Sequence, residues 1–219
     1  MLTRVVRSFA RLALPAALMV ALAGAGAVAQ QQEMPAKVRG TLKAVEGDTL
    51  VVENQAGETM GFALKEGAGL FKVTPASLAD VKEGDFVGIT SIERDGRRIA
   101  LETHLFSEDL RGTGEGHYAW DLVKEPNMMT NATVAEVKEG GQGRTLEVDY
   151  GANQEIGSPA GRQMIVVPGE APVVRLEKTD DRSLLQPGRD IFLMVEAPDD
   201  GPPVAVAAVV GDEGAKPPM

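Results

Sequence analysis

The residue types best suited to chemistry are concentrated in one short stretch of the chain. Residues 104–129 contain both histidines, the only tryptophan, one of the two tyrosines and a pair of adjacent methionines. Neutral imidazole is a ligand for zinc and copper, and a thioether is a ligand for Cu(I). This predicts a metal site as one hypothesis, with Asp109 or Glu115 as alternative carboxylate ligands. Its candidate ligands are His104, His117, Asp121, Met128 and Met129.

The same stretch supports two other interpretations, because its spacing matches no compact metal-ligand motif such as H-E-x-x-H. It can bind a small ligand or a partner peptide through Tyr118, Trp120, Arg111 and Glu115. It can also be a structured connector, whose aromatic side chains pack between two domains while the histidines only form hydrogen bonds. All three interpretations remain open at the level of sequence.

A nucleophilic enzyme is a weaker hypothesis. Ser107, His117 and Asp121 supply the residue types of a catalytic triad, but no G-x-S-x-G elbow accompanies them. The run Gly112-Thr113-Gly114-Glu115-Gly116 lacks the Lys-Ser/Thr that completes a phosphate-binding loop. We therefore expect a non-enzymatic protein.

The elements that flank this stretch have the pattern of short β-strands. In Thr59–Leu64, for example, Met60, Phe62 and Leu64 alternate with smaller or polar residues, which is typical of a half-buried strand. Asp95-Gly96 is a dipeptide favoured in two-residue hairpin turns. With 25 glycines and 13 prolines but few aromatic residues, the chain predicts many turns and short strands.

The strand pattern occurs twice along the chain. Thr145–Val148 repeats Thr49–Val52, and Leu184–Arg189 repeats Leu78–Asp85 with Gly188 at the position of Gly84. We therefore expect an all-β fold of two tandem small antiparallel barrels. The predicted boundaries are 1–29 for a signal peptide, 37–107 for the first barrel, 108–130 for the linking insert, 131–210 for the second barrel and 211–219 for a disordered tail. Small barrels are filled by side chains, so a site should lie on loops, on an outer face or between the two units.

The strand and turn residues resemble an exported bacterial family of uncharacterised OB-like barrel domains. The resemblance is carried by Val38–Leu42, Gly47–Val52 and Leu78–Val87. It extends over about residues 37–106 and, more weakly, 132–210. It implies an OB-like architecture and an exported binding or envelope-associated module, and it implies no catalytic residues.

Composition excludes several classes of function. The formal net charge is -10, which argues against binding nucleic acid through its phosphates. The chain has no cysteine, which excludes disulfides, thiolate metal sites and a lipoprotein anchor on cysteine.

The first 29 residues have the three parts of a secretory signal peptide. Arg4, Arg7 and Arg11 precede the apolar run Leu12–Ala23, and Ala27-Val28-Ala29 suits cleavage before Gln30. No later stretch is apolar enough to span a membrane. We therefore expect a periplasmic protein with no stable membrane span after cleavage.

Together these observations predict a non-enzymatic exported module that acts through the insert. Its partner would be an unidentified periplasmic protein or a small ligand, without nucleic acid and without a cofactor. The alternative is an accessory protein that binds zinc or copper, and a hydrolase-like enzyme comes third.

Overall fold

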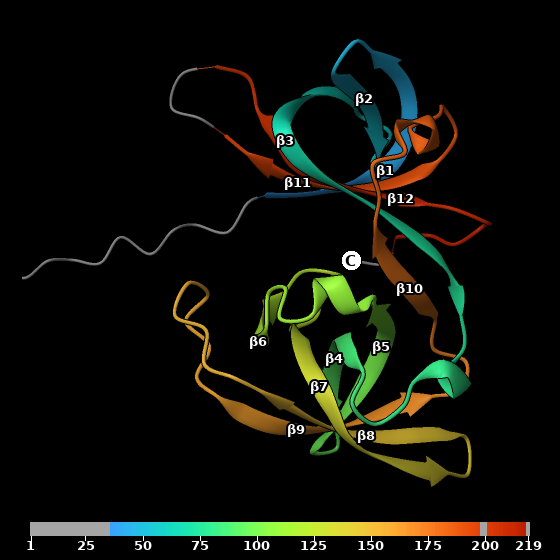
Figure 1. Ribbon diagram of the computed structural model, residues 1–219, viewed down its shortest axis with the longest axis vertical. Helices are drawn as coiled ribbons and strands as arrows, with labels where there is room; N and C mark the ends of the chain where they lie inside the picture. Colours follow the sequence, from blue (N-terminus) through green and yellow to red (C-terminus); the bar gives the residue numbers. More distant parts are fainter. Residues whose placement is uncertain (1–35, 198–200, 218–219) are drawn as a thin grey trace, which may run out of the picture. The chain divides into compact units, whose positions relative to one another are not determined.

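The protein is all-β, as the sequence predicts, and contains no α-helix in the part that is described. The computed structural model describes residues 36–197 and 201–217 (Figure 1). The predicted signal peptide therefore lies outside the described residues. The strands are β1 (Ala36–Glu46), β2 (Thr49–Asn54), β3 (Thr59–Ala76), β4 (Phe86–Arg94), β5 (Arg97–Phe106), β6 (Gly116–Trp120), β7 (Asn127–Gly140), β8 (Gly143–Tyr150), β9 (Gly161–Pro168), β10 (Val173–Lys178), β11 (Asp190–Glu196) and β12 (Val204–Gly211). Three single 3-10 turns, η1 (Leu78–Asp80), η2 (Glu108–Leu110) and η3 (Arg182–Leu184), join some of them.

Five strands form a closed β-barrel, which we call the first ring. The order is β12-β11-β1-β2-β3, and a parallel ladder between β12 and β3 closes it. Alternate residues of each strand point inward. The interior is therefore filled by side chains such as Leu42, Leu50, Phe62 and Leu193, each at most 2% exposed.

A second set of five strands, the second ring, is connected in the order β5-β4-β7-β8-β9. Two parallel pairs, Arg98 with Ile165 and Ile99 with Val166, link β5 back to β9. Its interior holds a separate cluster that includes Val87, Ile89 and Leu146. β6 pairs only with β7, as an extra strand beside this ring.

β10 joins the two rings. It pairs antiparallel with the second half of β3 and parallel with β5, so a strand of each ring runs along it (Figure 1). A third cluster, which includes Phe71, Phe86, Phe106, Leu176 and Phe192, packs between the outer faces of the two rings.

The strand register repeats along the chain. The β1–β2 ladder has a bulge at Leu42/Ala44, and the β7–β8 ladder has one at Val134/Glu136, 92 positions later. The β4–β5 bulge at Thr90/Ser91 likewise recurs 104 positions later in β11–β12, at Met194/Val195. Two ladder irregularities in the first half of the chain therefore recur in the second half.

Each ring nevertheless takes strands from both halves of the chain. Thr41 of β1 lies opposite Asp190 of β11, and the matching residue Thr133 of β7 lies opposite Phe86 of β4. The strands within residues 37–107 are thus divided: β1–β3 belong to the first ring and β4–β5 to the second. Strand structure also starts within the predicted insert, where β6 forms and β7 begins at Asn127.

The segment predicted as a disordered tail is described up to residue 217. Gly211 ends β12, the backbone N–H of Asp212 donates to the Val73 carbonyl, and Arg189 forms an ion pair of 2.7 Å with Asp212.

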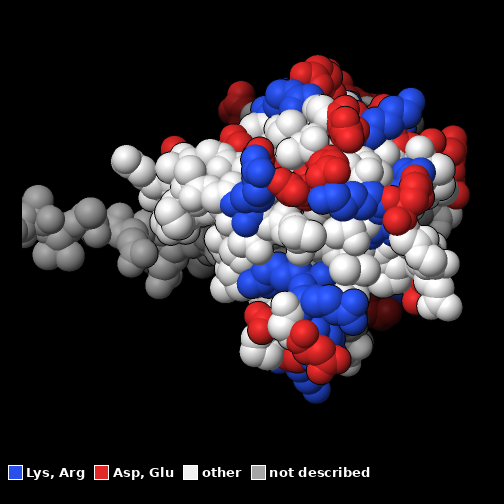
Figure 2. Space-filling model, turned by 90° about the horizontal axis from the view of Figure 1, so that it is seen from below, with Lys and Arg blue, Asp and Glu red and all other residues white. Residues whose placement is uncertain are grey.

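Acidic and basic side chains are interleaved on the face that Figure 2 shows. Within the described ranges, we find no helix with the length and apolar character that crossing a membrane requires.

Candidate functional site

A cavity of about 400 Å³ lies between the outer faces of the two rings. Its walls are mostly apolar and are rich in aromatic rings. These are Phe71, Phe106, Tyr118, Trp120 and Phe192. Its size and apolar lining are typical of small-molecule sites, which are apolar concavities with a few placed polar groups.

Tyr118 and Trp120 reach the cavity because residues two apart on a strand share a face. Their rings meet edge to face, with centroids 5.9 Å apart. Burial raises the pKa of the Tyr118 phenol to about 12, so the hydroxyl stays neutral. Its oxygen accepts a hydrogen bond of 3.4 Å from the Asn131 side-chain amide. Two residues named from the sequence as ligand contacts thus line the cavity.

The wall on the second ring is built on a row of polar residues. Gly88 pairs with both His104 and Asn131, and Thr90 pairs with Glu102, so these residues lie on the same face of β4, β5 and β7. Glu102 is 2% exposed and accepts a hydrogen bond of 2.7 Å from the Thr90 hydroxyl. His104 is 1% exposed, and its Nε2 lies 3.2 Å from Glu102 Oε1 without the alignment of a hydrogen bond.

The wall on the first ring has the same positions, but they hold apolar residues. The pair Gly88–His104 corresponds to Phe192–Val209, and Thr90–Glu102 corresponds to Met194–Ala207. Phe192, Met194, Ala207 and Val209 all line the cavity.

The equivalent positions of the two rings can be compared directly. The same strand positions are filled by apolar residues in one ring, so the fold does not need an acid and a histidine there. Buried polar groups are costly unless they are paired.

Three residues that line the cavity each have a buried polar atom that makes no hydrogen bond to the described residues, although His104 Nε2 lies 3.2 Å from Glu102 Oε1. The three atoms are His104 Nε2, Trp120 Nε1 and Asn131 Oδ1. A buried polar group without a partner costs about 1–3 kcal/mol. Gly88 makes room for two of these groups, since a Cβ there would lie 2.7 Å from Asn131 Oδ1 and 3.2 Å from His104 Nδ1.

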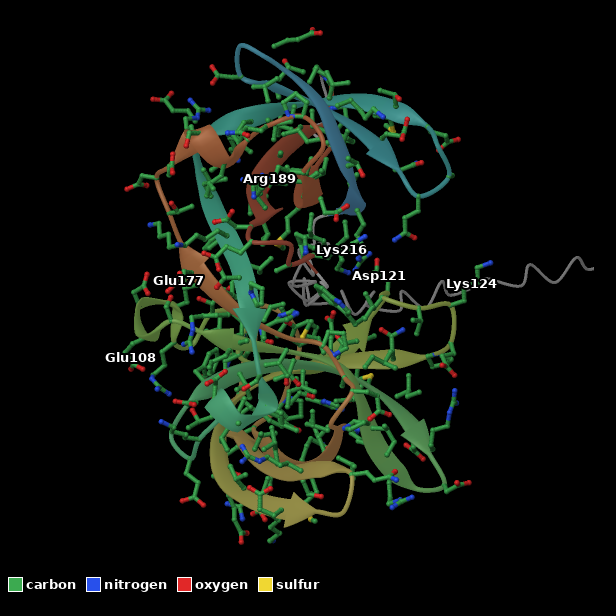
Figure 3. All side chains as sticks on the ribbon, turned by 90° about the vertical axis from the view of Figure 1, so that its right-hand side faces the viewer. Glu108, Asp121, Lys124, Glu177, Arg189 and Lys216 are labelled. Carbon is green, nitrogen blue, oxygen red and sulfur yellow. The ribbon has the colours of Figure 1, made fainter. Side chains whose placement is uncertain are left out.

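One end of the cavity is cationic. Lys37 lines it, with Nζ 4.0 Å from the centre of the Trp120 ring, in the geometry of a cation–π contact. Arg39 lies over the Phe192 ring at 5.2 Å. Both cations contact Asp121, at 3.6 Å from Lys37 and 2.9 Å from Arg39. In Figure 3, Asp121 lies where the two rings face each other.

The five candidate metal ligands are not brought together. His104 and Met129 line the cavity, and Asp121 pairs with Lys37 and Arg39. Met128 is opposite Ser91 and is directed away from Met129, its neighbour on the strand. Among the residues that can be described, no three His, Cys, Asp or Glu side chains form a metal-binding group.

His117 lies on the opposite face of the sheet from His104. It pairs with Thr130, one row away from the Asn131–Gly88–His104 row, and successive rows point to opposite faces. Its Nδ1 shares a hydrogen bond of 2.8 Å with the Thr130 hydroxyl, and its ring stacks on Tyr150 at 6.0 Å. Burial, helped by the nearby Arg98 cation, lowers the pKa of His117 to about 4.

Arg111 and Glu115, the other two predicted contact residues, hold the loop instead. Arg111 forms an ion pair of 2.6 Å with Glu108 and donates to the Gly84 carbonyl. The Glu115 carboxylate accepts a hydrogen bond from the Gly151 backbone N–H. The bond to Glu108 and the field of Glu108 and Asp85 raise the pKa of Arg111 above its ordinary value.

Sequence reasoning missed several lining residues, including Lys37, Phe71, Phe192 and Val209, and it missed the buried Glu102 beside His104. A comparison of the two halves of the sequence could have indicated some of them. At equivalent strand positions, Glu102 and His104 in one half correspond to Ala207 and Val209 in the other.

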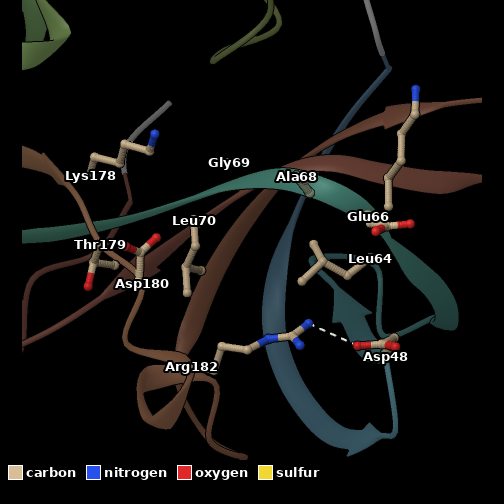
Figure 4. Close-up of a pocket in the computed structure, with 12 residues that line it drawn as sticks. Asp48, Leu64, Glu66, Ala68, Gly69, Leu70, Lys178, Thr179, Asp180 and Arg182 are labelled. Atoms are coloured by element: carbon tan, nitrogen blue, oxygen red, sulfur yellow. Dashed lines mark hydrogen bonds and ion pairs between the residues drawn. The ribbon is translucent and has the colours of Figure 1, made fainter.

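A second hollow, of about 550 Å³, is lined by the β1–β2 turn, the middle of β3 and the segment from the end of β10 to η3 (Figure 4). Its lining is largely charged, and the Arg182–Asp48 ion pair of 2.9 Å crosses it. Such exposed ion pairs contribute little to stability. The apolar cavity is therefore the stronger candidate for a binding site.

The chain was compared with protein-family models, curated proteins and solved structures. No family model, curated protein or solved structure matches the chain.

Proposed function

We propose that this protein is a non-enzymatic, exported binding module whose ligand occupies the cavity between the two rings. The observation that carries the proposal is the apolar cavity beside Tyr118 and Trp120. Its apolar walls supply affinity because a ligand that enters the cavity buries apolar surface. The ligand is therefore a small, mainly apolar molecule.

The proposed architecture is a pair of OB-like barrels that arose by internal duplication and exchanged their last two strands. Three antiparallel strands in sequence, a fourth that pairs with the first and a fifth parallel to the third describe β1-β2-β3-β11-β12 and equally β7-β8-β9-β4-β5. This Greek-key order supports the OB-like assignment. The exchange sets the equivalent outer faces of the two barrels against each other, with the cavity between them.

The experiment is a titration with N-phenyl-1-naphthylamine, an uncharged apolar dye that fluoresces when it leaves water. We expect one dye per protein with micromolar affinity. Ala207 is a small wall residue, so Ala207→Phe fills the cavity and should weaken binding at least tenfold. The matched control is Ala56→Phe, in an exposed turn, which should bind as the unchanged protein does. Absence of binding, or equal binding by both variants, would refute the proposal.

Export is tested separately. After expression in a bacterial host, the protein should be found in the periplasmic fraction with Gln30 as its first residue, because the predicted cleavage site follows Ala29. Protein that stays in the cytoplasm and retains Met1 would contradict this part of the proposal.

A further inference from the structure

We infer that the ligand is an amphiphile with an extended apolar chain and an anionic head, a carboxylate, which Lys37 binds. The inference rests on the proposed function and adds the chemical class of the ligand.

The charges of the lining residues indicate the sign of the head group. Lys37 is the one Lys or Arg that lines the cavity in the described part of the chain, and no Asp or Glu lines it. Its side chain is only 10% exposed. Asp121, the acid nearest to it, is 3.6 Å away and lies closer to Arg39, at 2.9 Å. A carboxylate head at Lys37 gains a charge-assisted hydrogen bond to a cation that is already largely withdrawn from water.

The strand register gives the shape of the ligand. Trp120, which lies under Lys37, pairs with Asn127, and Asn131 lies four residues further along β7. At about 3.3 Å per residue, the cationic and the neutral polar ends are separated by roughly 13 Å. Between these ends the lining is aromatic and aliphatic. A linear chain with a single charged end fits this arrangement.

The position equivalent to Lys37 in the second ring holds a methionine. Lys37 pairs with Met194 in the first ring, and the equivalent pair in the second ring is Met129 with Thr90. The same strand position is therefore compatible with methionine. Lys37→Met consequently removes the charge and keeps the apolar contact of the side chain.

Trp120 provides a direct readout, because it is the only tryptophan of the chain and its ring lines the cavity. We would titrate the full chain at pH 7.5 with decanoate, decanol and decylamine, which share a chain and differ in the charge of the head, and follow tryptophan fluorescence. The variants are Lys37→Met and, as the matched control, Lys65→Met, which also removes a lysine with one ion-pair partner, Glu196.

We expect decanoate to bind about tenfold more tightly than decanol and decylamine to bind most weakly. Lys37→Met should bind decanoate and decanol equally, and Lys65→Met should retain the preference. Equal binding of decanoate and decanol by the unchanged protein, or a preference that survives Lys37→Met, would overturn the inference. If the uncharged dye binds but decanoate does not, the inference fails and the proposed function stands; if neither binds, both fail.

Discussion

At the scale of single residues, the face of the sheet decides what each candidate side chain does. His104 and His117 are 13 positions apart and occupy neighbouring strand rows, but they point to opposite faces. His104 belongs to the cavity wall, whereas His117 packs against Tyr150. Spacing along the sequence could not reveal this, because the face depends on the register between β5, β4, β7 and β6.

Protonation of His117 should make the stability of the protein depend on pH. The pKa of His117 is lowered from 6.5 to about 4, mainly by burial. Between these values the unfolded chain binds a proton that the folded protein does not, so the free energy of unfolding should fall as the pH falls from about 6.5 to about 4. Because the ring is only half-buried, the slope should stay below about 1.4 kcal/mol per pH unit.

An NMR titration of the His117 ring, together with urea unfolding at several pH values, tests this. His117→Gln should reduce the pH dependence of stability over that window. A His117 ring that titrates near 6.5 would show that the ring is not desolvated in the way we describe.

At the scale of elements, local patterns were predictable and partners were not. The Asp95-Gly96 turn was predicted from the sequence, and both residues have positive φ, at 51° and 72°, between β4 and β5. The choice of partner was hidden because β4 and β11 occupy equivalent places in the order of strands, so that β1 could pair with either of them. Tyr118 and Trp120 were candidate contact residues because of their chemistry, whereas Lys37 and Phe192 lie on β1 and β11, far from them in the sequence.

The pairing of β1 with β11 predicts a specific cross-link. Thr41 lies opposite Asp190, whereas Phe86 would take that place if β1 paired with β4. The chain has no cysteine, so Thr41→Cys/Asp190→Cys introduces the only thiols. Directly opposed residues of an antiparallel pair have Cα atoms about 4.5–5.5 Å apart, within the range of a disulfide.

We expect this variant to form a disulfide within one chain, seen as a faster-migrating monomer on a non-reducing gel at every protein concentration. Two free thiols after oxidation, or cross-linked dimers alone, would mean that β1 and β11 of the same chain are not neighbours.

At the scale of the whole molecule, the division of strands between the rings makes the two rings depend on each other. Each ring needs strands from both halves of the chain, and β10 pairs with β3 and with β5. The described residues accordingly belong to one compact unit. Unfolding of either ring would separate strands that belong to both halves of the chain. It would also expose the hydrophobic cluster that packs between the two rings.

Thermal unfolding should therefore be a single cooperative transition, with a calorimetric enthalpy equal to the van't Hoff enthalpy. Differential scanning calorimetry provides both values. Two resolved transitions would indicate two barrels that fold independently, as a simple tandem arrangement would.

If the cavity beside Trp120 binds a small apolar ligand, the indole N–H of Trp120 should report the binding directly. The indole nitrogen has no hydrogen-bond partner among the described residues. Because Trp120 is the only tryptophan of the chain, a ¹H–¹⁵N NMR spectrum contains a single indole cross-peak. We predict that this peak shifts on addition of N-phenyl-1-naphthylamine and stops shifting at one equivalent, and that it does not shift in Ala207→Phe. An indole peak that stays in place while the dye binds would place the ligand elsewhere and contradict the account.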